Sequence, residues 1–303
     1  MDLLGLPPAT YYRWTERQAG GTLTDQIVLP LRQVLLPTPV EVAAVCQFAR
    51  RYPEVGYKRL TWQMVDQDVA CLRPYQVYAI LTDNNLMARS AKPVETGLHR
   101  PPEPDHADEV WHIDLMYLYI RSKWYYLVDI LDGYSRYLVA WSLNLTMAAD
   151  TVTSTVEQAL EKLINRRPGE PRLVHDHGSQ FVSREWHDFI TSAGVTDIKT
   201  RVAHPQSNGR LERLHRTHRE EGLTDDDQSS YYAACDGMTR WSAYYNTARP
   251  HSSLNYLYPV DYYRGDPVAR LAERQEKLAE ALKERQGYWQ TNSDVKGQDD
   301  PLT

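Results

Sequence analysis

Three acidic residues stand in local sequences that suit ligands of a divalent metal ion. Asp114 lies inside a β-forming run, and Asp176 ends an apolar run that continues directly into Gly178. Glu212 follows Asp176 after 35 intervening residues. Carboxylates from two strand ends and a helix can hold a pair of Mg²⁺ ions, and paired Mg²⁺ is a usual means of breaking and joining phosphodiester bonds. The predicted substrate is therefore a nucleic-acid backbone.

Each acid also has an ordinary structural explanation. An Asp within a strand needs a partner that offsets its loss of water, and for Asp114 that partner is either a bound cation or an Arg or Lys side chain. Among the neighbouring acids, Asp132 is expected in a turn for backbone reasons and Asp129 is expected to face outward, so both rank below Asp114. Glu212 is also explained by a favourable helix-dipole interaction or by a surface ion pair with Arg216.

Two histidines, His175 and His177, flank Asp176 and raise the alternative of a zinc site. Adjacent strand residues point to opposite faces and no Cys lies nearby, so this alternative receives little weight. The 3 cysteines of the chain are isolated, which argues against a disulfide framework and favours a reducing compartment. No segment resembles a signal peptide or a long apolar span, so a soluble cytoplasmic protein is expected.

The charge distribution partly agrees with a nucleic-acid substrate. The net charge of −6 is unusual for such a protein, because nucleic-acid binders usually carry a basic surface. Between Lys199 and Arg219, however, six Lys and Arg residues accompany a single acid, Glu212. The chain also has 21 Tyr and 8 Trp but only 3 Phe; amphipathic rings suit nucleic-acid faces, and equally the rim of a core.

Residues 1–92 read as a helical region. The run 3–14 is typical of the second half of a helix-turn-helix, with a turn at its start, and a further helix is predicted at 40–51. A helix within 56–65 and another that opens at Pro74 form a second helix-turn-helix candidate. From the pattern alone, an ordinary helical hairpin is an equal alternative.

The periodicity becomes that of strands after a Pro-rich linker at residues 93–106. Residues 111–119 alternate, with His112, Asp114 and Met116 on one side. Two more β-rich runs follow after short connections, which predicts an antiparallel meander. A helix with an apolar stripe from Val152 to Ile164 comes next, ended by Pro168 and Gly169. The remaining predicted elements are a strand at 172–175, a helix at 184–193 capped by Ser183 and Gly194, a strand at 195–200 and a helix bearing Glu212.

This order, βββαβαβα, predicts an α/β domain with a mixed five-stranded sheet flanked by helices. Beyond it, residues 267–286 are predicted to form a charged amphipathic helix with a Glu273–Lys277 pair one turn apart. The favoured interpretation is a solvated tail helix, and the alternative is a helix used in oligomer assembly.

The combination of motifs resembles a known family. The segment from Trp111 to about Gly265 is similar to the catalytic core of the DDE superfamily of bacterial insertion-sequence transposases and retroviral-type integrases, which has an RNase H-like fold. Upstream, residues 3–14 and 56–86 resemble the helix-turn-helix segments that precede this core in the second-frame product of some insertion sequences. The matching motifs are WHID at 111–114, YLVDILDGYSRYLVAW at 126–141, DHGSQF at 176–181, HPQSNGRLERLHRT at 204–217 and YYNTARPHSSLNYLYPVDYY at 244–263.

The resemblance implies that Asp114, Asp176 and Glu212 are catalytic ligands of two Mg²⁺ or Mn²⁺ ions. One ion would activate a water or a DNA 3′-hydroxyl, and the other would stabilise the leaving oxygen. Composition, periodicity and the resemblance together predict four domains: a DNA-binding helical region at 1–92, the linker at 93–106, the integrase catalytic core at 107–265 and a charged helix and tail at 266–303, which lies outside the resemblance. The expected DNA contacts are Lys199, Arg210, Arg213 and Arg216 near the acids, and Lys58 and Arg59 at the transposon end.

The expected partners are transposon ends and target DNA, further copies of the chain assembled on DNA, and a helix-turn-helix protein from an upstream frame, without a membrane. The expected location is the bacterial cytoplasm, at the nucleoid when DNA is bound. His177 departs from the small polar or basic residue more frequent in the family, and its role is open. The chain begins inside the first helix-turn-helix, which fits either the second product of a frameshifted pair or a truncated copy.

The leading functional hypothesis is a transposase that cleaves and joins DNA at insertion-element ends. One rival is a nuclease that cuts without joining. The other is a catalytically silent DNA-binding remnant that keeps the fold.

Overall fold

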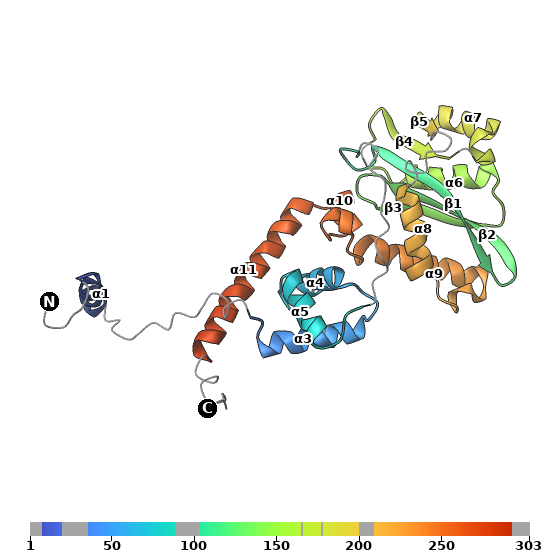
Figure 1. Ribbon diagram of the computed structural model, residues 1–303. Helices are drawn as coiled ribbons and strands as arrows, with labels where there is room; N and C mark the ends of the chain where they lie inside the picture. Colours follow the sequence, from blue (N-terminus) through green and yellow to red (C-terminus); the bar gives the residue numbers. More distant parts are fainter. Residues whose placement is uncertain are drawn as a thin grey trace.

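A computed structural model describes residues 8–19, 36–88, 103–164, 166–176, 178–199 and 209–292 of the chain. They form a helical region, an α/β core and a long C-terminal helix (Figure 1). The helical region comprises α1 (Pro8–Ala19), α3 (Pro39–Arg51), α4 (Tyr57–Asp66) and α5 (Pro74–Asp83). The core and the helices after it comprise β1 (Val110–Ile120), β2 (Lys123–Asp132), β3 (Leu138–Asn144), α6 (Ala149–Leu160), β4 (Gly169–His175), α7 (Arg184–Ala193), β5 (Val195–Lys199), α8 (Gly209–Glu221), α9 (Tyr231–Thr247), α10 (Pro259–Tyr263) and α11 (Pro267–Thr291).

The sheet has five strands in the order β3-β2-β1-β4-β5. The first three strands form an antiparallel meander, whereas β4 pairs with β1 and with β5 in parallel. This confirms the predicted mixed sheet with its RNase H-like strand arrangement. Because β1 lies in the centre, its residues are next to both the meander and the parallel half of the sheet.

Helices cover both faces of the sheet along the first part of β1, where successive side chains point to opposite faces. Trp111 and Ile113 face one core, which α6 and α7 complete. Met116, on the opposite face, belongs to a second core that includes Leu214 of α8 and Met238 of α9. Figure 1 shows the sheet between these two pairs of helices. The side chains of even-numbered residues on β1, including Asp114, therefore lie on the side of α8.

The helix α7 has the predicted bounds and caps. The Ser183 hydroxyl accepts a hydrogen bond from the Trp186 N–H at 3.1 Å, which satisfies a free donor of the first turn. Gly194 ends the helix in the left-handed conformation with φ 61°, where a residue without Cβ has no steric cost.

The helix α6 is shorter than predicted. It ends at Leu160, and the N–H groups of Lys162 and Leu163 then bond to carbonyls three residues back, which tightens the chain out of the helix. The prediction that Ile164 widens the apolar stripe is wrong, because this side chain is 72% exposed.

The helical region has its own apolar core. Leu60 and Met64 of α4 pack against Val77 and Leu81 of α5 and against α3, which confirms the predicted faces. The connection between α4 and α5 spans residues 67–73 and is longer than the three- or four-residue turn of a compact helix-turn-helix. The predicted turn at the start of the run 3–14 lies outside the described residues.

The solvated-tail interpretation of the C-terminal helix is wrong. The Arg274 side chain of α11 is 2% exposed, and its guanidinium donates to both carboxylate oxygens of Asp66 in α4, at 2.8 and 2.6 Å. The same guanidinium lies over the Trp62 ring, 4.8 Å from its centroid. The predicted Glu273–Lys277 pair is present at 3.3 Å. The helix thus packs on the helical region through a charged face. The cost of burying the Arg274 charge is offset by its pairing with the Asp66 carboxylate.

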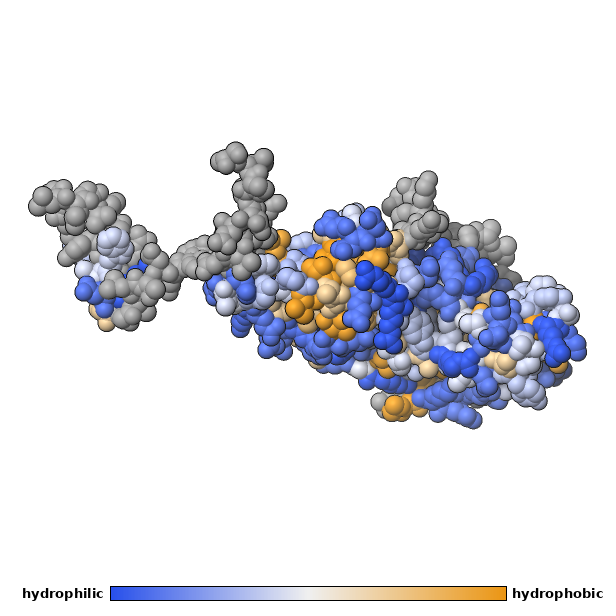
Figure 2. All heavy atoms as spheres, turned by 90° about the horizontal axis from the view of Figure 1, so that it is seen from below, coloured by the Kyte–Doolittle hydropathy of each residue, from blue (hydrophilic) through white to orange (hydrophobic). Residues whose placement is uncertain are grey.

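The surface of the helical region carries exposed apolar groups. Figure 2, which views the molecule from below, shows hydrophobic side chains gathered where Figure 1 places α3 and α5. Val40, Val69 and Met87 are among the exposed large hydrophobic residues of this region. Within the described residues, no helix is both long and apolar enough to cross a bilayer.

Candidate active site

Asp114 lies in the middle of the central strand, half-buried beneath α8. The register of the meander places it directly opposite Asp129 of β2. With a two-residue turn at Arg121 and Ser122, counting back along both strands gives this pairing from the sequence. Two carboxylates directly opposite each other on the same face repel, so this pair requires a cation.

The structure supplies that cation from α8, and it corrects the expectation that Asp129 faces outward. Asp129 is completely buried, and its Oδ2 lies 3.2 Å from Nε2 of His215, which is 5% exposed. The other ring nitrogen, Nδ1, lies 3.8 Å from Oδ2 of Asp114. The contact with Asp129 is an ion pair without hydrogen-bond alignment. His215 is not among the predicted site residues, although it lies three residues after Glu212 on α8.

The environment of Asp114 disfavours its charge. Burial raises the pKa of Asp114 to about 6, although His215 and the Leu115 N–H act in the opposite direction. The nearby carboxylates of Asp176 and Asp129 add to the rise. Burial lowers the pKa of His215, but its two carboxylate partners outweigh this effect and hold the pKa above its ordinary value. Like charges that crowd a half-buried site are typical of a place that binds cations.

Asp176 follows the last residue of β4 and is exposed. Its position is fixed by the buried residue before it: Nε2 of His175 lies 2.5 Å from Oδ1 of Asp197 in β5. The ring stacks on Phe181 with 4.1 Å between centroids, and its Nδ1 lies 2.7 Å from the Asp176 carbonyl oxygen. These contacts occupy both ring nitrogens of His175 and leave it no role as a zinc ligand. His177 lies outside the described residues.

Glu212 lies in the first turn of α8, as predicted, with an exposed side chain. Two contacts to the sheet flank it. Nη1 of Arg210 donates to Nε2 of His112 at 2.9 Å, and His215 reaches the two carboxylates three residues further along. Residues three apart on a helix are neighbours, so Glu212 lies one turn from the Asp114 contact.

The first of these contacts belongs to a polar cluster that reaches the surface at Glu103. Arg210 and Arg136 both donate to Oε2 of Glu103, at 2.8 and 2.7 Å. Burial lowers the pKa of His112 to about 3, and the two guanidinium groups add to the effect, so the ring is neutral and accepts from Arg210. Glu103 belongs to the predicted linker, and here it helps to fix the start of α8.

The six predicted DNA contacts differ in availability. Arg213, Arg216 and Lys199 are exposed. Arg59 pairs with Glu221 at 3.0 Å, and Arg210 binds His112 and Glu103. Lys58 is exposed on α4. Three cations near the acids are therefore exposed where a phosphate can reach them, whereas Arg59 and Arg210 hold elements together.

The donor types at this site suit a hard divalent ion, since all three predicted ligands are carboxylates. Asp114 and Asp176 are close enough to affect each other electrostatically. Among the described residues, however, no three His, Cys, Asp or Glu side chains lie close enough together to hold a metal ion. The structure thus brings the two aspartates together and leaves Glu212 at the edge, one helical turn away.

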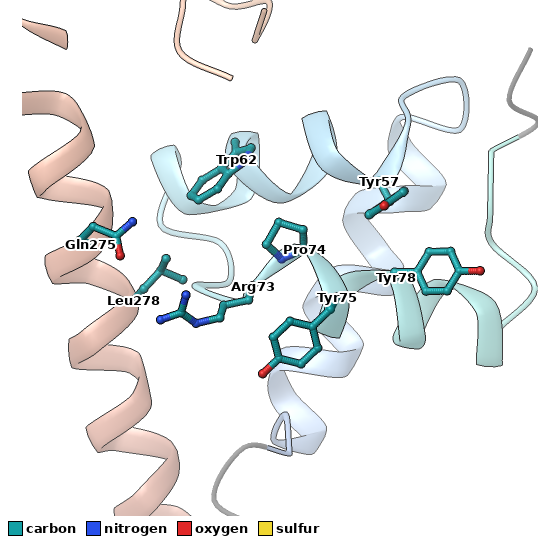
Figure 3. A pocket seen from close by; sticks show the side chains of 8 residues that line it. All are labelled: Tyr57, Trp62, Arg73, Pro74, Tyr75, Tyr78, Gln275 and Leu278. Atoms are coloured by element: carbon teal, nitrogen blue, oxygen red, sulfur yellow. The ribbon is translucent and has the colours of Figure 1, made fainter. Parts of the chain in front are cut away.

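A separate hollow of about 660 Å³ lies between α4, α5 and α11, away from the acids (Figure 3). Tyr57, Trp62, Tyr75 and Tyr78 line it together with Arg73. Tyr75 and Tyr78 are about half exposed. Rings and a guanidinium in an open hollow suit a flat or anionic partner more than a small apolar molecule.

Two family profiles match the α/β core. Both carry the description "Integrase core domain", and they match residues 104–205 and 193–259. Together they span more than half of the chain and include Asp114, Asp176 and Glu212.

Relatives of the chain are proteins of bacterial insertion sequences. The transposase for IS904 of Lactococcus lactis is 29% identical over 157 residues, which cover 51% of this chain and 61% of the relative. The putative transposase InsK for IS150 of Escherichia coli is 24% identical over 166 residues, 54% of this chain and 58% of the relative. An uncharacterized 31.7 kDa protein of IS407 from Burkholderia multivorans is 23% identical over 228 residues, 74% and 80% of the two chains. The chain thus spans about three fifths of the first two relatives.

Among solved structures, the HTLV-2 integrase catalytic core domain in complex with magnesium has 16% identity and a TM-score of 0.41, covering 53% of this chain and 99% of that one. The family assignment rests on the sequence matches. With matches over residues 104–259, the chain belongs to the integrase core domain family, and it is similar to transposases of bacterial insertion sequences.

Proposed function

We propose that this protein cleaves DNA at the ends of an insertion element and joins those ends to target DNA, in a reaction that depends on Mg²⁺ or Mn²⁺. The observation that supports this most directly is the crowding of Asp114 and Asp176 beneath a basic helix: burial raises the pKa of Asp114 to about 6, and the Asp176 carboxylate adds to the rise. A divalent cation would relieve this crowding, and the DNA backbone would lie along the exposed cations.

We propose Asp114, Asp176 and Glu212 as the ligands. Two bound ions would supply an activated oxygen nucleophile and stabilise the leaving oxygen. The three side chains suit divalent ions because all are carboxylates and because the two aspartates carry like charge close together. Glu212 lies on the adjacent helical turn. No side chain needs to form a covalent bond with DNA.

The other residues of the site are proposed either to position Glu212 or to bind DNA phosphates. The contacts Arg210–His112 and His215–Asp129 fix α8 on the sheet and so set where Glu212 stands. Exposed Arg213, Arg216 and Lys199 are proposed to bind the phosphates of the reacting strand. Arg59 and Arg210 are proposed as structural supports, since both guanidinium groups already bind carboxylates.

The helical region at 1–92 is proposed to hold the transposon end. Lys58 is exposed on α4, and the hollow beside α5 adds Arg73 and exposed tyrosine rings (Figure 3). A helix-turn-helix would present such groups to the duplex. The remaining boundaries, a linker at 93–106 and a core at 107–265, belong to the same proposal.

We also propose assembly of several copies on DNA. The exposed apolar surface of the helical region supports this, because a patch of that kind usually marks an interface. A helix-turn-helix protein from an upstream frame is a further proposed partner.

The test is incubation of the full chain with Mg²⁺, labelled inverted-repeat ends of its element and a target plasmid. Joined products are expected. Cleaved ends without joining would indicate a nuclease, and binding without either product would indicate a catalytically silent DNA-binding protein. Either result would contradict the proposal. EDTA should abolish both products and leave end binding intact.

A further inference from the structure

The far end of the β1–β2 hairpin carries aromatic rings that the mechanism does not use. Tyr117 and Tyr119 continue the odd-numbered series of β1 beyond the part that α6 and α7 cover, and they are 57% and 52% exposed. Their cross-strand partners are Tyr126 and Trp124, and Trp124 is 58% exposed. Figure 1 shows this end of the hairpin at the rim of the core, away from α7 and β5. The rings therefore form an open row on the sheet face opposite Asp114.

The row is preformed. The centroids of Tyr117 and Tyr126 are 5.2 Å apart, and those of Tyr119 and Trp124 are 4.9 Å apart. The pairs are edge-on or tilted rather than stacked face to face, and Tyr117, Tyr119 and Trp124 each stay more than half exposed. The reverse face of the hairpin is anchored, since Tyr125 stacks on Tyr231 of α9 with 5.5 Å between centroids. Ordering these rings for a ligand would cost little entropy, because their backbone and neighbours already hold them.

The charge of the hairpin is the opposite of the chain's charge. Residues 115–128 contain Arg121 and Lys123 and no acid, although the chain has a net charge of −6. Both cations are exposed at the tip, and neither is in an ion pair with the part of the chain that the structure describes. Residues 138–149, which form β3 and its extension, also contain no acid. A row of aromatic faces next to unneutralised cations complements unpaired bases and their phosphates.

We propose that this hairpin binds single-stranded DNA by stacking unpaired bases on Trp124, Tyr119 and Tyr117, with Arg121 and Lys123 at the phosphates. This proposal depends on the proposed function for one point only, namely that the bound nucleic acid is DNA. A second copy of the chain is the competing occupant. The two cations disfavour it, because no acid in the hairpin could pair with them across a symmetric contact.

The first experiment locates the contact. A twelve-residue thymidine oligonucleotide carrying 5-iododeoxyuridine is irradiated with the full chain in EDTA, and the crosslinked peptides are identified by mass spectrometry. Crosslinks to the peptide that contains Tyr119 and Trp124 are expected. Crosslinks confined to other peptides would overturn the proposal.

The second experiment measures affinity for the same oligonucleotide by fluorescence anisotropy, without metal. Trp124→Ala should weaken binding about 5- to 100-fold, and Trp124→Phe should restore most of it, because a ring face remains. Tyr232→Ala is the matched control, since Tyr232 is an exposed ring on α9, 79% accessible, outside the hairpin. An affinity unchanged by Trp124→Ala, or a dimer that this variant converts to a monomer while affinity stays constant, would contradict the proposal.

The two proposals can fail separately. Loss of end joining with hairpin crosslinks intact would reject the strand-transfer function alone. Normal joining with no hairpin crosslink would reject the hairpin alone. The variants Arg121→Gln and Lys123→Gln together should reduce the salt dependence of binding, because two phosphate contacts are removed.

Discussion

Nε2 of His215 lies 3.2 Å from Oδ2 of Asp129, and this buried contact joins the helix that carries Glu212 to the strand next to Asp114. The pair holds α8 against the sheet on the side of the predicted metal ligands. It also neutralises a carboxylate that would otherwise face Asp114 without compensation. The site thus depends on Asp129, which the sequence pattern ranked below Asp114.

Asp129→Asn should destabilise the folded protein. The change leaves His215 buried with one carboxylate partner, and breaking a buried pair of this kind costs about 3–5 kcal/mol when the charge stays unpaired; deprotonation of His215 should reduce the loss to roughly 1–3 kcal/mol. Urea unfolding measures it. Asp188→Asn removes a carboxylate from an exposed pair and should change stability by less than about 0.5 kcal/mol. Equal effects of the two changes would show that the buried pair contributes nothing.

Without metal, Asp114 and His215 should each contribute less to stability at pH 8 than at pH 5, whereas His112, whose pKa is lowered to about 3, acts in the opposite direction. The pKa of His215 is raised in the fold, so its contribution is complete below about pH 6.5 and is lost as the pH rises through the folded value. The pKa of Asp114 rises to about 6, so its protonated form favours the fold below about pH 4, and this contribution is lost as the pH rises through about 6. The difference in thermal stability between Asp114→Asn and the wild type, followed in EDTA across this range, isolates the Asp114 contribution from that of the histidines. A variant that gains no stability over the wild type from pH 5 to pH 8 would contradict the direction assigned to Asp114.

Asp114→Asn should be inactive and yet more stable than wild type at pH 7 in EDTA. The amide removes the cost of a crowded, half-buried charge, roughly 1–3 kcal/mol for a pKa raised to about 6. Mg²⁺ should stabilise the wild type by mass action and leave the variant unchanged. Thermal unfolding with and without Mg²⁺ gives both readings. A variant that Mg²⁺ stabilises as much as the wild type would place the ion elsewhere.

Arg274→Gln should loosen the C-terminal helix. The change leaves Asp66 buried without its bidentate partner, at a cost of about 3–5 kcal/mol. Glu273→Gln, which removes a surface pair on the same helix, should cost less than about 0.5 kcal/mol. Limited proteolysis and urea unfolding follow the two variants. Retained protection of α11 in Arg274→Gln would show that its apolar contacts alone hold it.

Much of the α/β core follows from local patterns, because its elements carry their own signals. The bounds of α7 come from a capping Ser and a terminal Gly, and the strands from alternation. The end of α6 does not follow from the local pattern. The apolar stripe continues past the last helical residue into a turn that also packs on the core. The fate of α11 depends on Asp66, about 200 residues earlier in the chain, and no local pattern shows such a partner.

Some residues of the candidate site can be predicted from the sequence, and others only from the fold. Asp114, Asp176 and Glu212 follow from motif order, and the structure places two of them together. The support at Asp129 requires the hairpin register, which a count from the turn at Arg121 and Ser122 would have given. The support at Glu103 was not accessible from sequence, because a proline-rich segment gives no sign that its acid will bind two arginines of the core.

The most direct test of the account compares single changes of the three acids in the end-joining reaction with Mg²⁺. Asp114→Asn, Asp176→Asn and Glu212→Gln should each reduce cleavage and joining by about 1,000-fold or more, since each removes a ligand worth several kcal/mol in the transition state, and each should still bind the labelled end. Glu220→Gln, an exposed acid on the same helix as Glu212, should keep activity within about twofold of wild type, because it lies outside the site. Near-wild-type joining by any of the three variants would contradict a shared metal site built from Asp114, Asp176 and Glu212.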